Sequence, residues 1–241
     1  MPRPLGFGNA DIVMVLSNTY QLSSSHDARA TKIDPDNELL WRMDRRRLTA
    51  ESIRDAMLSV SGQLDPERGG PSLGLELKNN IAGLGGNVNP PTWAGQTADY
   101  VKNRRTVYLP FKRERPMGEL EVLSVFDFPH PSEITGARSN TTVPTQALFL
   151  LNSPFVKQQA SRLSERLNQA YPNDERARIN QLYLLAMNRP ATSLEIQTVL
   201  TFLDQCVQEI EKTAASEEAR STAWIQLCHA VLGSNGFLFR E

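Results

Sequence analysis

The residues best suited to chemistry gather in one stretch, from Arg104 to Ser153. Within it, Asp127 and His130 flank Pro129, and proline fixes its own backbone φ, so both side chains are held with little conformational freedom. An acid beside a histidine can orient a general base or complete a metal shell. The alternative is that Asp127 accepts hydrogen bonds from local backbone amides while His130 stands in solvent. The sequence leaves both interpretations open.

The same stretch carries cations and neutral polar groups. Arg113 and Arg138 could each bind a carboxylate, sulfate or phosphate through paired N–H donors. The alternative is an internal ion pair with one of three nearby acids, Glu119, Glu121 or Glu133. Asn140 and Thr141 add amide and hydroxyl groups in a turn-prone segment. The predicted ligand-binding set is therefore Arg113, Asp127, His130, Arg138, Asn140 and Thr141.

Prolines make this stretch stiff although its sequence predicts little regular structure. They fix φ at five points, Pro110, Pro116, Pro129, Pro131 and Pro144. A stiff irregular backbone has little ordering entropy left to lose when a ligand binds. We expect Tyr108–Arg115 and Asp127–Thr142 to fold against each other into one concavity at the base of a helical bundle. The concavity would belong to a polar surface spanning residues 104–146.

No motif in the sequence identifies a metal, a cofactor or a nucleophile. His26, His130 and His229 are too scattered for a zinc site by spacing alone. The pair Cys228-His229 lacks the first cysteine of a c-type haem motif. We therefore predict no metal and no cofactor, and we assign no catalytic residue.

Two classes of function remain. One is a binding or scaffolding module that docks a partner domain, a carbohydrate-like ligand or an anionic ligand. The other is a hydrolase that acts on an anionic or polysaccharide substrate through Asp127, His130 and Arg138. Covalent or acid–base catalysis needs two groups placed together, and the sequence shows no nucleophile beside a base. This favours the binding module.

Helical signals dominate the elements that must position these residues. Thr49 is a good N-cap for a helix over 50–63, and shorter helices are expected over 11–21, 119–126 and 145–151. Start signals for three further helices are Pro154, Asp174 and the Thr192–Glu195 capping box, and a fourth helix covers 216–232. The β-branched run Thr106–Leu109 predicts a strand that pairs with another near Ser72–Leu75. The predicted fold class is mainly α: a C-terminal bundle of about four helices, with a small irregular β element and long loops in the N-terminal half.

Composition and charge set further bounds on this chain of 241 residues. A net charge of −1 creates no overall field that would recruit nucleic acid, and no apolar run reaches the roughly 20 residues of a membrane helix. The longest apolar run near the start, Ile12–Leu16, is too short for a signal peptide. Cys206 and Cys228 are predicted to be reduced and buried.

Several motifs together resemble the domain of unknown function 1553 family. They are WRMDRRRL (41–48), SGQLD (61–65), GGPS (69–72), RRTVYLP (104–110), FDFPHPSEITGARSNTTVPTQALFLLNSPFV (126–156), LYLLAMNRP (182–190) and SNGFLF (234–239). The resemblance implies a C-terminal domain of large multidomain proteins of planctomycetes and related bacteria. It implies an extracytoplasmic location, and partner domains upstream in a longer parent chain that include a c-type cytochrome domain. It implies no particular activity.

The resulting domain division has two parts. Residues 1–33 are expected to be a helix remnant and linker. Residues 34–241 are expected to be a single domain, with a mixed, loop-rich half at 34–143 and the helical bundle at 144–241.

Overall fold

The computed structural model describes residues 9–69, 103–109, 121–130, 133–212 and 216–240. They are mainly helical, with one two-stranded sheet, which confirms the predicted fold class. The chain forms two compact units, one of residues 1–47 with 239–241 and one of residues 48–238. The domain division predicted at residue 34 stays a prediction.

The smaller unit combines two short helices with the sheet. Helix α1 spans Asn9–Val15 and α2 spans Ala28–Ile33. Asp27 begins α2 because its carboxylate accepts the backbone N–H groups of Arg29 and Ala30. The sheet pairs strands β1 (Arg46–Arg47) and β2 (Phe239–Arg240) in antiparallel register. The β structure therefore joins the two ends of this unit.

The first helix of the larger unit is α3, Ala50–Val60. The hydroxyl of Thr49 accepts the N–H of Ser52, which confirms Thr49 as the N-cap. The helix ends before its predicted limit of residue 63 because Gly62 takes a left-handed φ of +76°. Its apolar face packs on α6 (Glu121–Val125), which buries Val122 and Leu123, and the loop after α6 leads to α7 (Pro144–Asn152).

The strand predicted at Thr106–Leu109 is wrong. Residues Thr106–Tyr108 form a 3-10 helix, η3. The N–H and hydroxyl of Thr106 both donate to Asp55, and the N–H groups of Tyr108 and Leu109 donate back to Arg105 and Thr106. These contacts satisfy locally the backbone groups that a strand would pair with a neighbour, so context overrides the β-propensity of the run. Residues 72–75, the expected partner, lie outside the described part of the chain.

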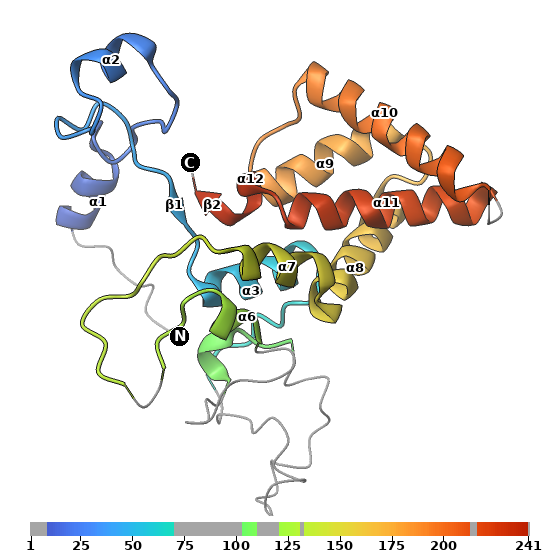
Figure 1. Cartoon of the computed structure of the whole chain (residues 1–241), viewed down its shortest axis with the longest axis horizontal. Coiled ribbons are helices and arrows are strands. Elements are labelled where there is room, and N and C mark those ends of the chain that lie inside the picture. The colour runs from blue at the N-terminus through green and yellow to red at the C-terminus, as the bar shows by residue number, and fades with distance from the viewer. Residues whose placement is uncertain (1–8, 70–102, 110–120, 131–132, 213–215, 241) are drawn as a thin grey trace, which may run out of the picture. The chain divides into compact units, whose positions relative to one another are not determined.

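Four long helices form the C-terminal bundle. They are α8 (Pro154–Ala170), α9 (Glu175–Met187), α10 (Ser193–Ile210) and α11 (Ser216–Leu232), with the short α12 (Asn235–Leu238) after them. Helix α11 packs against α8 and α10, and α9 contacts α8, α10 and α11; Figure 1 shows α10 and α11 running side by side. The start signals are confirmed at Pro154, at Asp174, which accepts the N–H of Ala177, and at the capping box of Thr192 with Glu195.

Helix α10 buries only part of the apolar stripe that its residues form at helical spacing. Val199 and Leu203 are buried, whereas Ile196, Leu200, Val207 and Ile210 are partly exposed. The reason is that α10 packs mainly on α11 and α9, so only the residues facing those helices are covered.

A polar cluster ties three of these helices together. Arg220 on α11 donates from Nε to the carboxylate of Glu175 on α9 at 2.8 Å, and from Nη1 to Asp204 on α10 at 2.9 Å. The hydrogen bond from Arg220 lowers the pKa of Glu175, and the same bond raises the pKa of Arg220. The cluster therefore has a structural role.

The two cysteines differ in a way that the sequence did not predict. Both are free thiols, but only Cys228 is buried, and Cys206 is half-buried. Burial raises the pKa of the Cys228 thiol to about 12, so little of the reactive thiolate forms at neutral pH. Cys206 lies on α10, whose outer side is incompletely covered.

We therefore expect a thiol reagent such as Ellman's reagent to label Cys206 well before Cys228 in the native protein. A Cys206→Ser variant should then show only slow labelling, and a Cys228→Ser variant should keep the fast phase. Equal labelling rates for the two variants would contradict the assigned burial.

Candidate functional site

The site is built on the loop between α6 and α7. Asp127 ends α6 in the left-handed conformation, with φ +60°, and the N–H of Phe128 donates to the carbonyl of Leu123. The carboxylate of Asp127 accepts the N–H of Thr141 at 2.8 Å and its hydroxyl at 2.8 Å. One acid therefore both terminates the helix and closes the loop on itself.

A buried amide holds the same two ends. Gln146, on the first turn of α7, donates from Nε2 to the carbonyls of Val125 and Thr141, each at 3.1 Å. Its side chain is nearly inaccessible to solvent. Because a buried amide without partners is costly, these bonds fix the positions where the loop leaves α6 and joins α7.

The middle of the loop is attached to α3 by Arg138. Its Nη1 donates to both oxygens of Glu51, at 2.8 and 2.9 Å. Its guanidinium carbon also lies 5.7 Å from the centre of the Phe128 ring, within the range of a cation–π contact. Arg138 therefore makes an internal ion pair, the kind of contact given above as the alternative to ligand binding, but its partner is Glu51, 87 residues away in the chain, and not one of the three acids named there.

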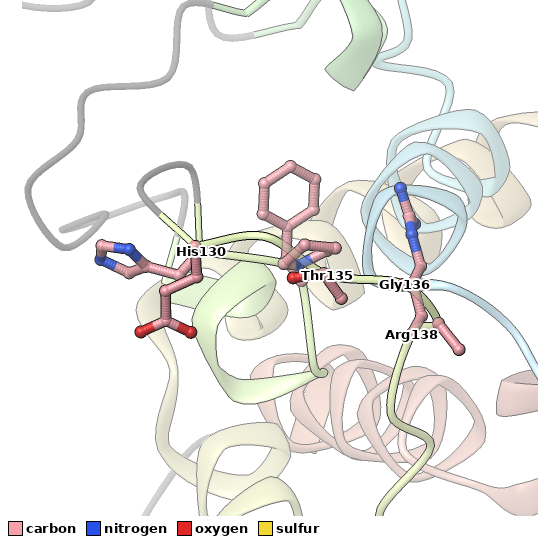
Figure 2. A pocket seen from close by; sticks show the side chains of 8 residues that line it. His130, Thr135, Gly136 and Arg138 are labelled. Carbon is pink, nitrogen blue, oxygen red and sulfur yellow. The ribbon is translucent and has the colours of Figure 1, made fainter.

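These attachments leave a concavity of about 550 Å³ on the surface of the loop. It is lined by Phe128, Pro129, His130, Glu133, Thr135, Gly136, Ala137 and Arg138. Figure 2 shows His130 at one end of this set and Arg138 at the other, with the Arg138 side chain extending towards α3. The lining is polar and of mixed charge, which suits a polar ligand better than an apolar one.

The predicted site residues fall into three groups. His130 and Arg138 line the same concavity. Asp127 and Thr141 bond to each other at the neck of the loop, and Asn140 is exposed beside them. Arg113 lies outside the described residues. The described lining holds His130 together with Glu133 and without Asp127, so the acid beside the histidine at the concavity is not the one that the hydrolase alternative names.

Sequence reasoning missed the contributions of α3. Glu51 holds Arg138, and Asp55, one helical turn later, accepts hydrogen bonds from Thr106. Acids at i and i+4 share one face of a helix, and the sequence itself shows this spacing for Glu51 and Asp55. The partners lie so far along the chain that only the tertiary structure pairs them.

The described ranges hold neither a metal-binding cluster nor a membrane-spanning helix. They contain no group of three or more His, Cys, Asp or Glu side chains placed to hold a metal ion. None of their helices is long and apolar enough to cross a bilayer.

Fold and site together define a mainly helical protein with a polar concavity on a loop closed by its own side chains. The chain matches the family model PSD1, protein of unknown function (DUF1553), over residues 12–203, and it belongs to that family. The resemblance read from the motifs is thereby confirmed. Comparisons with curated proteins and with solved structures find no match.

Proposed function

We propose that the chain is a binding module whose binding surface is the concavity lined from residues 128–130 and 133–138, within the polar stretch 104–146. The observation that carries the proposal is the half-exposed Arg138. Glu51 holds it from one side through Nη1, and 49% of its side-chain surface remains accessible. It is thus a positioned cation with donors still available to a ligand.

The closed loop supports the same proposal. Its ends are tied by Asp127 and Gln146 and its middle by Glu51. A ligand that enters such a loop immobilises little additional backbone, so less of the interaction energy is lost to ordering. The mixed lining of His130, Glu133 and Arg138 fits an anionic or carbohydrate-like ligand.

Replacing Arg138 by alanine tests this function. With a mixture of oligogalacturonides as the anionic carbohydrate probe, binding should shift the amide NMR signals of His130, Thr135 and Gly136. Arg138→Ala should weaken binding by about 1.5–3 kcal/mol, the range for a charge-assisted hydrogen bond. Unfolding free energy should change by about 1 kcal/mol at most, because exposed ion pairs contribute little.

A matched control is available on α8. Arg162 is equally exposed, at 48%, and holds one acid, Glu165, at 3.0 Å. Arg162→Ala should bind the probe like the native protein. The proposal fails if the probe leaves the signals of residues 128–138 unchanged, or if Arg138→Ala and Arg162→Ala bind it equally well.

A further inference from the structure

A second concavity shares Phe128 and Arg138 with the first. It measures about 380 Å³, and its walls come from the first turns of α3, from η3 and from the loop after α6. Two arginines from distant parts of the chain, Arg105 and Arg138, line it together. They meet there because α3 presents two acids one turn apart, and each acid holds one arginine.

The carboxylates in this concavity already accept hydrogen bonds from the protein, whereas the two guanidinium groups use few of their donors. Oδ1 of Asp55 accepts the N–H and hydroxyl of Thr106, at 2.8 and 2.6 Å, and both oxygens of Glu51 accept Nη1 of Arg138. The side chains of Glu51 and Asp55 are 25% and 20% exposed, against 49% and 52% for Arg138 and Arg105. The surface offered to solvent is therefore rich in donors.

Arg105 is held less closely by its acidic partner than Arg138 is. Within the described part of the chain it makes one ion pair, from Nε to Oδ2 of Asp55 at 3.8 Å, which is beyond hydrogen-bond distance. Arg138 uses Nη1 alone for its hydrogen bonds in those same residues. A guanidinium carries five N–H donors in a fixed plane, so both arginines retain donors for a ligand.

The other residues that line the second concavity indicate what kind of group the ligand carries beside its anion. Val107 is 73% exposed and Phe128 is partly exposed, so an apolar surface lies beside the two arginines. Ser52 adds a hydroxyl. The four charged side chains sum to zero, so recognition rests on directional donors at short range rather than on a long-range field.

We infer that this second concavity binds an oxyanion, a carboxylate or a phosphate, attached to an apolar body, with the oxyanion between Arg105 and Arg138. Planar guanidinium groups match both anions through paired hydrogen bonds. The apolar body lies against Val107 and Phe128. The inference rests on the proposed binding function and names the chemistry of its ligand.

Titration by NMR tests the inference with defined probes. Phenyl phosphate and benzoate carry the two oxyanions on the same ring, and benzyl alcohol carries the ring without an anion. At least one of the two anions should shift the amide signals of Ser52, Thr106 and Val107 saturably, and benzyl alcohol should not. Which anion binds more tightly decides between a phosphate and a carboxylate ligand.

Variants of Arg105 complete the test. Arg105→Gln should weaken binding of the better anion by about tenfold or more, and Arg105→Lys should recover only part of the loss, because lysine lacks the planar fork. Arg162→Gln, on α8, should bind like the native protein. Circular dichroism establishes that each variant is folded.

The inference is overturned if neither anion binds saturably at these residues, or if Arg105→Gln binds as well as the native protein. In that case the inference is rejected while the proposed function stands, provided that the oligogalacturonide probe still shows Arg138-dependent binding at the first concavity. If that probe also gives no shift, the proposed function falls with it.

Discussion

Replacing Asp55 by alanine is expected to destabilise the protein by about 3–5 kcal/mol, the range for breaking a buried ion pair by removing one partner. Arg54 is 1% exposed, and its Nη1 lies 3.5 Å from Oδ1 of Asp55. The same nitrogen donates to the carbonyl of Arg104 and to the hydroxyl of Thr106. Without Asp55, a buried cation loses its nearby carboxylate, and the N–H of Thr106 loses its acceptor.

Denaturation by urea, followed by circular dichroism, measures this effect. The matched control is Glu51→Ala, one turn earlier on the same helix, where the partner Arg138 is half-exposed and a loss of at most about 1 kcal/mol is expected. Asp55→Asn, which keeps an acceptor but no charge, should fall between the two. A loss for Asp55→Ala no larger than for Glu51→Ala would show that Arg54 is not held as described.

The second large effect is expected from Leu203→Ala, at about 2–5 kcal/mol. Leu203 is fully buried on α10, where the helix meets α9 and α11. Truncation removes apolar contact and leaves a cavity that the rigid bundle fills only in part. Its control, Leu194→Ala on the same helix, removes a side chain that is 73% exposed and should cost less than about 0.5 kcal/mol.

Thermal and urea unfolding of these two variants measure how firmly α10 is packed. Helix propensity is matched between them, because both exchange leucine for alanine within α10. Similar losses for both variants would place the packed face of α10 elsewhere.

Local signals in the sequence determined the helices and their starts. Thr49, Asp174 and Thr192 begin helices because a side-chain oxygen satisfies backbone N–H groups within three residues, an interaction that depends on neighbours along the chain. Apolar residues at helical spacing likewise form the buried faces of α8 and α11. Motifs spread from residue 41 to residue 239 were enough to indicate the family.

Only the tertiary structure decided what the polar residues do. Thr106–Tyr108 is helical because Asp55, 51 residues earlier, binds Thr106. Arg138 pairs with Glu51 rather than with acids close to it in the chain, and it lines both concavities. Ion pairs and hydrogen bonds between distant residues depend on where the folded chain brings them. Residue types and their spacing therefore indicated the candidate residues, and tertiary packing determined which partners they contact.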